Sequence, residues 1–351
     1  MTKIPVILDT DIGDDMDDTW ALALLLRMPE VFDLKLIVTS GFGHHAGRAQ
    51  IVAKFLSVCG KPDVPIGLGC QNSASTNTED PFGTPLPQGD WAADYNMADH
   101  SGQVSEDGIQ LLIDTALASE VPMALITIGP CGNIAEALRR QPKIAHKLHF
   151  VGMHGSINQG YGPGSDAAAE YNVYKDVPAC RACFQAPFLT KRITPLDTCG
   201  AIRLKGELYK ELLSACSTVP LVKAIIGGYD TWYATIQNPS LKKVFKPDST
   251  STILFDTVAV LLASSIIAAP AGSDREQRQH SSAYLELETH TVKVTDDGFT
   301  RVTNSGDPEG GEMLVALNWK DGGLRAFRDF LVEALVGGTG TAAEAGARAR
   351  L

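Results

Sequence analysis

The sequence has little basic charge and no long apolar run. Its 30 lysine and arginine residues are outnumbered by 41 aspartate and glutamate residues, which gives a formal net charge of −11. Nucleic acids and anionic membranes attract basic patches, so we expect neither as a partner. The longest apolar run, Val258 to Ala269, is interrupted by two serines. It is shorter than the roughly 18–20 residues that a membrane span needs.

The sequence also lacks a regular pattern of cysteines. The seven cysteines are scattered and odd in number, which favours a reducing compartment over a disulfide framework. The first residues run straight into a strand-like segment without the pattern of a signal peptide, so we expect a cytoplasmic protein. One close pair, Cys180 and Cys183, falls in an amphipathic segment, and no second pair completes a zinc site. Ordinary helix packing is the favoured interpretation of that pair.

Strand-like and helix-like segments alternate through roughly the first two hundred residues. This alternation predicts an α/β fold, with a Rossmann-like, largely parallel central sheet and helices on both faces. No linker divides the pattern, so we expect a single domain over residues 1–336. The strand-like runs are Val6–Leu8, Leu34–Thr39, Met123–Ile128, Leu148–Val151 and Phe188–Ile193, and the helix-like segments are Thr19–Arg27, Ala46–Cys59, Gly108–Ala118, Ile134–Arg140 and Val177–Phe184.

The C-terminal part of the chain has a different pattern. Thr289–Val294 and Thr300–Val302 alternate like strands and are joined by an Asp-Asp-Gly turn, which predicts a small antiparallel element. A last helix is expected over Gly323–Leu335. Residues 337–351 are rich in Gly, Ala and Thr, which predicts a disordered tail. The polar, turn-rich segment Gln71–Asp107 is expected to be a long functional loop.

The most informative segment is an acidic cluster near the start of the chain. Six aspartates fall within ten positions, between an apolar strand-like run and a helix-like run. Aspartates in a first helical turn complement the helix dipole, and this would account for Asp17 and Asp18. It does not account for Asp9 and Asp11, which alternate at the end of a strand. Carboxylates that close repel one another, so the cluster predicts a site for a hard divalent cation.

Three later segments add candidate ligands. A strand ends at Ile128 in a Gly-Pro turn, where backbone carbonyls can point at a ligand. Glu170 and Asn172 lie two residues apart, and in an extended segment they would share one face, suited to neighbouring hydroxyls. Asp256 stands at the head of an apolar helix, where it could equally be a simple N-cap.

Together these motifs resemble those of the inosine-uridine-preferring nucleoside hydrolase family. The matching features are Asp-Thr-Asp-x-Gly from Asp9 to Gly13, an Asp-Asp pair at Asp17, a strand ending in Gly-Pro before Asn-Ile-Ala, Ala-Glu-Tyr-Asn up to Asn172, and a C-terminal helix headed by Asp256. The chain looks like a subgroup with two extra residues between the Gly and the Asp-Asp pair. The resemblance covers about residues 4 to 335.

The resemblance implies Ca²⁺-dependent hydrolysis of the N-glycosidic bond of a ribonucleoside to ribose and a free base, by a homo-oligomer (dimer or tetramer). Asp11 would be the general base for a metal-bound water. By position, the Ca²⁺ ligands would be Asp11, Asp18, Asp256 and the main-chain carbonyl of Ile128. The substrate-binding residues would be Asp17, Glu170, Asn172 and Phe255, with Asp9 orienting the others.

The sequence departs from the family pattern where the base should bind. Many purine-active members carry a histidine before the C-terminal Asp, where it protonates the departing base, but this chain has Phe255. A phenylalanine can only stack or pack. The family's asparagines expected after Thr39 and before Glu170 are also absent. The histidines and tyrosines that could donate a proton in place of Phe255 are His44, His45, His154, Tyr229 and Tyr233.

Two alternatives belong to other functional classes. A strand followed by Asp-x-Asp also occurs in haloacid-dehalogenase-type phosphatases, where Asp9 would be the nucleophile. The phosphatase motif requires Thr or Val at position 13, where this chain has Gly13. It also requires a second acidic pair at the end of a later strand, where this chain has only Asp256. A non-catalytic ribose or nucleoside sensor would keep the pocket without an acid, although the presence of Asp11 argues against it.

Overall fold

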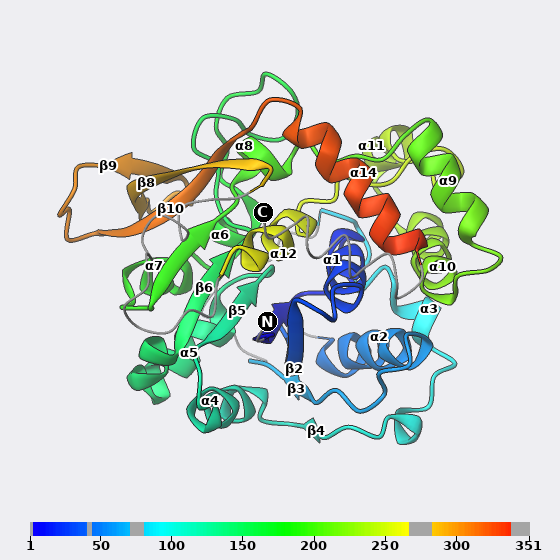
Figure 1. Ribbon diagram of the computed structural model, residues 1–351, viewed down its shortest axis with the longest axis horizontal. Helices are drawn as coiled ribbons and strands as arrows, with labels where there is room; N and C mark the ends of the chain where they lie inside the picture. The colour runs from blue at the N-terminus through cyan, green and yellow to red at the C-terminus, as the bar shows by residue number, and fades with distance from the viewer. Residues whose placement is uncertain (1–2, 41–43, 71–80, 267–282, 338–351) are drawn as a thin grey trace.

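The computed structural model describes residues 3–40, 44–70, 81–266 and 283–337, and within them the chain has the predicted α/β architecture. Ten strands form one sheet in the order β4-β3-β2-β1-β5-β6-β7-β10-β8-β9 (Figure 1). The strands are β1 (Ile4–Thr10), β2 (Phe32–Thr39), β3 (Ile66–Leu68), β4 (Val104–Ser105), β5 (Met123–Thr127), β6 (Leu148–Gly152), β7 (Thr190–Ile193), β8 (Leu285–Val294), β9 (Thr300–Thr303) and β10 (Gly310–Trp319).

The first seven strands are parallel to their neighbours, and the strand order reverses at β1. From β1 the chain builds outward through β2, β3 and β4, and it then returns to the other side of β1 with β5. Asp9 on β1 is opposite Val38 on β2 and Thr127 on β5. Ligands of open α/β sheets bind at the carboxyl ends of the strands at such a reversal. The acidic segment after β1 therefore occupies the expected position of a ligand site.

Helices cover both faces of the sheet, as the strand–helix alternation predicts (Figure 1). One apolar core includes residues of α1, α2, α8, α9, α10, α12 and α14, and a second includes residues of α4, α5, α6, α7 and η2. The helices are α1 (Asp17–Leu26), α2 (His45–Val58), α3 (Gly89–Ala92), α4 (Gly108–Ala118), α5 (Gly132–Arg140), α6 (Tyr171–Lys175), α7 (Val177–Gln185), α8 (Leu196–Cys199), α9 (Glu207–Ala215), α10 (Pro220–Thr235), α11 (Pro239–Val244), α12 (Thr257–Ser264) and α14 (Gly323–Val336), with 3₁₀ turns η1 (Met97–Asp99) and η2 (Pro142–Lys147).

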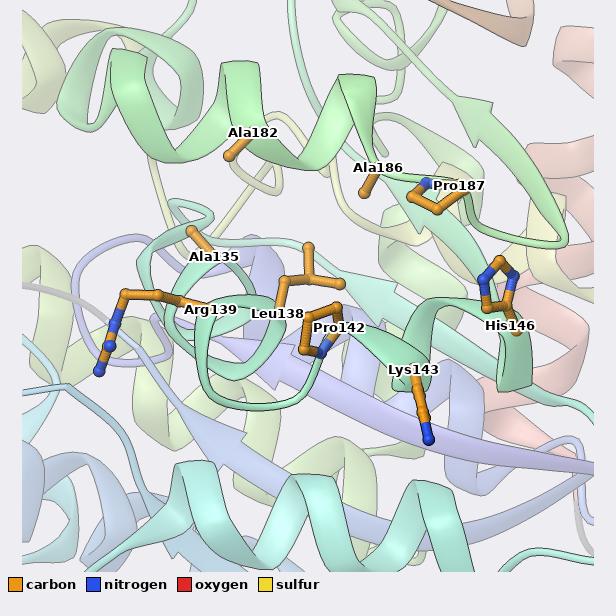
Figure 2. Close-up of a pocket in the computed structure, with 9 residues that line it drawn as sticks. All are labelled: Ala135, Leu138, Arg139, Pro142, Lys143, His146, Ala182, Ala186 and Pro187. Carbon is orange, nitrogen blue, oxygen red and sulfur yellow. The ribbon is translucent and has the colours of Figure 1, made fainter.

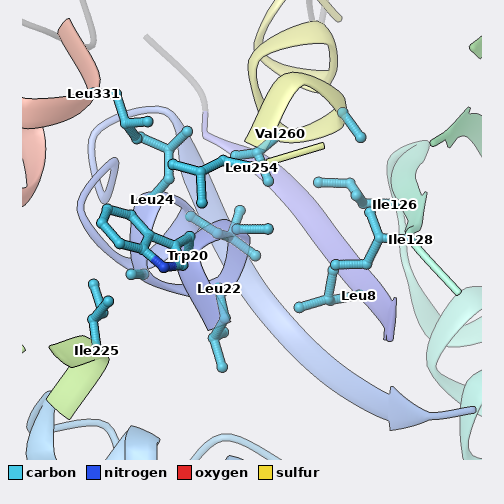
Figure 3. Close-up of a cluster of buried hydrophobic side chains, with 14 of the residues drawn as sticks. Leu8, Trp20, Leu22, Leu24, Ile126, Ile128, Ile225, Leu254, Val260 and Leu331 are labelled. Atoms are coloured by element: carbon cyan, nitrogen blue, oxygen red, sulfur yellow. The ribbon is translucent and has the colours of Figure 1, made fainter. Parts of the chain in front are cut away.

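Side chains of β1 alternate between the two cores. Val6 and Leu8 contribute to the first core, whereas Ile7 contributes to the second. A strand that is buried on both faces has a continuous apolar sequence rather than an alternation of apolar and polar residues. Figure 3 shows Leu8 in the first core with Trp20 of α1 and Val260 of α12. This packing brings the start of α12 next to α1, although the two helices are far apart in the sequence.

The C-terminal strands differ from the prediction. β8 is a single long strand that pairs antiparallel with both β9 and β10, so the predicted hairpin is present. Sequence reasoning missed β10, which pairs parallel with β7 and so joins the hairpin to the main sheet. The backbone of β10 comes so close to α7 that a Cβ at Gly311 would collide with the Phe184 carbonyl oxygen. The glycines that start β10 permit this approach but also weaken its strand pattern.

The predicted long loop, Gln71–Asp107, is partly wrong. Residues 71–80 lie outside the described residues, as does the predicted tail after Gly337. The rest contains α3, η1 and β4. Trp91 of this segment packs against Phe55 of α2, with ring centroids 6.3 Å apart. Among the described residues, no single helix meets the length and apolarity of a membrane span, and only the bent pair α9–α10 does so jointly, by length and composition.

Candidate active site

The acidic segment folds as a turn that joins β1 to α1. Gly13 has φ +115°, a conformation that side chains other than glycine rarely adopt. The turn directs Asp17 and Asp18 into the first turn of α1, where both are buried. The Thr10 hydroxyl, at the end of β1, donates a hydrogen bond to Asp18. The turn therefore places two carboxylates at the positive end of a helix, next to the carboxyl end of β1.

Asp256 joins these two carboxylates from the C-terminal half of the chain. Carboxylate oxygens of Asp17, Asp18 and Asp256 all lie within 4.8 Å of one another. Asp256 precedes α12, but its side chain accepts no capping hydrogen bond among the described contacts, so the simple N-cap interpretation is wrong. We call these three residues the aspartate cluster. Buried oxygen ligands at this spacing are the donor set that Ca²⁺ and Mg²⁺ prefer.

Asp11 directly follows β1 and lies beside the aspartate cluster, against the turn after β5. A Cβ on Gly129 would be only 2.9 Å from Asp11 Oδ1, so the turn after β5 packs directly against this carboxylate. Ile128, the residue before Gly129, accepts a hydrogen bond of 3.1 Å from Asn172 Nδ2 on its carbonyl oxygen. A carbonyl oxygen has two lone pairs, so this contact leaves one for a cation. All four predicted metal ligands thus lie at one end of the sheet, but the three carboxylates within 4.8 Å of one another include Asp17, which was predicted to bind substrate, and not Asp11.

The charges of this region are strongly unfavourable without a counter-ion. Burial and the nearby Asp14 raise the pKa of Asp11 to about 7. Burial, and then repulsion from neighbouring aspartates that include Asp11, hold the pKa of each carboxyl group in the aspartate cluster well above its usual range. Removal from water and like-charge proximity both disfavour the ionised form. A bound divalent cation would reverse both effects.

A buried arginine, Arg48 of α2, partly offsets this negative charge. Burial alone would lower its pKa, but Asp14 and Asp11 outweigh that effect and raise it. Its guanidinium group makes two 2.8 Å contacts with the Asp14 carboxylate and donates to the main-chain oxygens of Asp11 and Ile12. These contacts fix the turn rather than neutralise the aspartate cluster. Sequence reasoning missed Arg48, because a lone arginine in a helix gives no signal of its partner.

Asp9 contacts a different group. Its Oδ1 accepts a 2.7 Å hydrogen bond from Nδ2 of Asn133, which begins α5 and also donates to the Thr39 carbonyl oxygen. The Asn133 Oδ1 accepts from the backbone N–H of Cys70. Burial raises the pKa of Asp9 to about 8. Asn133 therefore links the ends of β1 and β2 to the segment after β3, and Asp9 is placed to orient the segment that carries Asp11.

Asn172, which contacts the Ile128 carbonyl oxygen, follows Glu170 by two residues. The prediction that they share a face of an extended segment is wrong, because Asn172 is in α6 and Glu170 is its N-cap. The Glu170 carboxylate accepts from the backbone N–H groups of Gly155 at 2.9 Å and Asn172 at 2.8 Å. The Asn172 amide nitrogen donates to the carbonyl oxygens of Ile128 and Met153. The Asn172 Oδ1 is then the atom of this side chain that can accept a hydrogen bond from a ligand.

The aromatic ring of Phe255 lies beside the aspartate cluster, because Phe255 directly precedes Asp256. Its ring meets that of Tyr161 edge to face, with centroids 6.1 Å apart and planes at 84°. Tyr161 belongs to the loop between β6 and α6, and its hydroxyl oxygen accepts a 2.9 Å hydrogen bond from the backbone N–H of Tyr171. Sequence reasoning missed Tyr161, since it lies in a Gly-rich loop without periodicity.

Comparison with known proteins identifies the family. The family model for inosine-uridine preferring nucleoside hydrolases matches residues 6–327. The chain belongs to this family. The haloacid-dehalogenase-type alternative is therefore not favoured.

Curated members of the nucleoside hydrolase family match the chain more locally. The pyrimidine-specific ribonucleoside hydrolase RihA of Salmonella agona (strain SL483) is 28% identical over 189 residues, and that of Escherichia coli O81 (strain ED1a) is 28% identical over 195 residues. Each alignment covers 52% of this chain and 57% of the relative. The chain thus spans little more than half the length of the curated relatives that it matches.

Solved nucleoside hydrolase structures match nearly the whole chain. A plant nucleoside hydrolase has a TM-score of 0.71 at 18% identity and covers 96% of this chain and 100% of its own. A purine-preferring ribonucleoside hydrolase from Gardnerella vaginalis has a TM-score of 0.66 at 19% identity and covers 97% and 99%. These matches confirm the fold of the family.

The five proton donors considered from the sequence differ in how well they could serve a nucleoside hydrolase. His154 is fully buried, its ring near Phe150 and Phe184, and burial lowers its pKa to about 4. His45 is also buried, at the start of α2, and burial lowers its pKa. His44 is exposed, with φ 57°. A neutral, buried imidazole is a poor source of a proton for a ligand.

The two tyrosines of α10 are equally poor candidates. Tyr229 is buried beside Trp232, with ring centroids 5.9 Å apart. The Tyr233 hydroxyl donates to the Lys242 carbonyl oxygen at 3.3 Å.

A surface pocket of about 400 Å³ lies elsewhere, between α5, η2 and α7 (Figure 2). It is lined by apolar side chains and by the basic residues Arg139, Lys143 and His146, without a carboxylate among its lining residues. Arg139 is bound to Glu136 at 2.7 Å. These helices cover the face of the second core, whereas the aspartate cluster lies at the start of α1 and α12. We therefore place the active site at the aspartate cluster.

Proposed function

We propose that this protein hydrolyses the N-glycosidic bond of a ribonucleoside to ribose and a free base. The observation that carries the proposal is the aspartate cluster with Asp11 beside it, at the strand-order reversal of a nucleoside hydrolase fold. Cleavage of a glycosidic bond develops positive charge on the sugar. A buried, carboxylate-rich pocket stabilises that charge electrostatically.

The donor set fits a hard divalent cation, and we propose Ca²⁺. Asp11, Asp18, Asp256 and the Ile128 carbonyl would hold it, since all four offer oxygen and lie at one end of the sheet. A bound cation of this kind lowers the pKa of water and fixes its position. The raised pKa values of the metal-free carboxyl groups support this assignment, because they show how unfavourable the cluster is without a positive partner.

Each side chain would then have one task. Asp11 would accept a proton from the attacking water. Asp17, Glu170 and Asn172 would bind sugar hydroxyls. Phe255 would contact the base. Correct placement of the sugar can contribute roughly 7–11 kcal/mol to the lowering of the barrier, so these binding residues matter as much as the base.

The test is turnover on a nucleoside panel. The protein is treated with EDTA, supplied with Ca²⁺ or left metal-free, and incubated with uridine, inosine, adenosine and nicotinamide riboside. We expect release of reducing sugar from at least one nucleoside with Ca²⁺ and a loss of at least tenfold without it. Binding of nucleosides without sugar release would support the sensor, and phosphate release from sugar phosphates would support the phosphatase.

The state of the cysteines bears on the location of the protein. All seven cysteines are free in the structure, as the sequence led us to expect for a reducing compartment. We propose a cytoplasmic homo-oligomer that acts on a small-molecule substrate. Gel filtration with light scattering would test the assembly, and a monomer would contradict it.

A further inference from the structure

The departing base needs a proton, and the family's usual donor position holds Phe255. An N-glycosidic bond breaks with its electron pair on the base nitrogen, and a positioned acid typically accelerates such a step by about 10²–10⁴-fold. Of the donors considered from the sequence, His154, His45 and Tyr229 are buried, and the Tyr233 hydroxyl donates its proton to the Lys242 carbonyl oxygen. Tyr161, in the loop between β6 and α6, meets three requirements for such an acid.

The first requirement is position. The Tyr161 ring touches Phe255, and Phe255 directly precedes Asp256 of the aspartate cluster. The Tyr161 hydroxyl oxygen is 2.9 Å from the backbone nitrogen of Tyr171. Tyr171 lies between the two residues proposed to bind sugar hydroxyls, Glu170 and Asn172. The hydroxyl therefore lies between the segment that carries Asp256 and the segment that binds the sugar.

The second requirement is a proton that is available for donation. The backbone N–H of Tyr171 donates to the Tyr161 oxygen, so the phenolic hydrogen must point elsewhere. Burial of the hydroxyl end and the nearby Glu170 carboxylate raise the pKa of Tyr161, so the group is protonated at neutral pH. The Tyr171 N–H would also stabilise the phenolate that remains after proton transfer.

The third requirement is access with a fixed position. The Tyr161 residue is 49% exposed, so its ring can meet a ligand. The loop around it is tied by Ser165, whose hydroxyl donates to the Gly162 carbonyl oxygen at 2.8 Å, and by Ser156, whose hydroxyl donates to the Gln159 carbonyl oxygen at 2.7 Å. Contacts on both sides therefore hold the loop position of Tyr161.

We propose that the Tyr161 hydroxyl is the general acid that protonates the departing base, an inference that rests on the proposed nucleoside hydrolysis. The water oxygen bonds to C1′ and gives a proton to Asp11. The C1′–N bond breaks, its electron pair stays on the base nitrogen, and that nitrogen takes the proton of Tyr161. Asp11 then releases its proton to solvent and Tyr161 takes one up, so one water is consumed in each turnover.

The test compares leaving groups that need a proton with one that does not. Tyr161→Phe keeps the ring contact with Phe255 and removes only the hydroxyl. We expect kcat on inosine and uridine to fall about 100-fold. This is near the low end of the roughly 10²–10⁴-fold contribution of a general acid, because a phenol has a pKa above the working pH. Hydrolysis of 4-nitrophenyl riboside, whose leaving group departs as a stable anion, should change less than threefold. Tyr174→Phe, at an exposed tyrosine of α6, is the matched control and should change neither rate.

The ratio of the two rates in one preparation does not depend on how much of the variant is folded. An equal loss on all three substrates would show that Tyr161 only positions the site, and no loss on any would show that it has no role. Both results would overturn the proposal. A wild-type protein that hydrolyses none of the substrates would instead refute the proposed function.

Discussion

Replacement of Asp256 by asparagine should uncouple the stability of the protein from calcium. The substitution removes one charge from the aspartate cluster but keeps the volume of the side chain. Because Asp256 makes no capping hydrogen bond with its side chain, the start of α12 should tolerate the change. We therefore expect metal-free Asp256→Asn to be at least as stable as metal-free wild type, and its response to calcium to be lost.

The expected size follows from the geometry. Two unit charges 4.8 Å apart repel by about 3.5 kcal/mol at an effective dielectric constant of about 20. Removal of Asp256 takes away two of the three pairs in the aspartate cluster. At a calcium concentration of about 100 times Kd, binding stabilises the wild type by about 2.7 kcal/mol. An unfolding entropy of about 2.1 cal/mol/K for each of 351 residues converts this to a rise in Tm of about 4 °C.

The assay is thermal unfolding of EDTA-treated protein with increasing Ca²⁺. We expect the Tm of wild type to rise by about 4 °C and that of Asp256→Asn to rise by less than 1 °C at the same calcium concentration. Asp114→Asn, at an exposed position of α4, is the matched control and should respond like wild type. A rise in Asp256→Asn equal to that of wild type would refute the reasoning, since calcium would then bind without the aspartate cluster.

Three further predictions concern residues around the aspartate cluster. Asp11→Asn should lower kcat by at least about 100-fold in a reducing-sugar assay, with the Tm of the metal-free protein unchanged within 2 °C, and unchanged turnover would exclude Asp11 as the base. Asn133→Ala removes hydrogen bonds to Asp9, Thr39 and Cys70 and should lower the free energy of unfolding in urea by about 2–4 kcal/mol, whereas a loss below 1 kcal/mol would contradict the linking role. The pKa of His154 is lowered from 6.5 to about 4, so the unfolded state binds its proton first and stability falls as the pH drops from 6.5 towards 4. His154→Gln should therefore lose about 2 kcal/mol less than wild type between pH 7 and pH 5, and equal losses would contradict a buried neutral histidine.

Local patterns predicted the features that arise from short segments. The strand from Val6 to Leu8 and the acidic turn after it each depend on a short contiguous segment, and both are present in the structure. The alternation of strands and helices was sufficient to predict a parallel sheet with two covered faces. That sheet places the carboxyl ends of its strands along one edge, but the pairing of Asp11 with Ile128 was implied only by the family resemblance, because the alternation does not give the strand order.

Features that depend on contacts between distant segments could not be predicted. β10 is stabilised by β7 and β8 rather than by its own pattern, and its initial glycines hide it. The pairing of Arg48 with Asp14 joins two elements that no periodicity relates. Tyr161 and Phe255 meet only because the loop after β6 folds over the start of α12. The capping role of Glu170 was missed because the short helix α6 gives almost no helical signal.

The most direct test of the metal site is a crystal grown with Ca²⁺ and measured for anomalous scattering. We predict one strong anomalous peak at the aspartate cluster, with oxygens of Asp18 and Asp256 at about 2.3–2.6 Å from it. No peak there, in a protein that still releases sugar from a nucleoside in EDTA, would contradict the central claim that these buried aspartates hold a cation for catalysis.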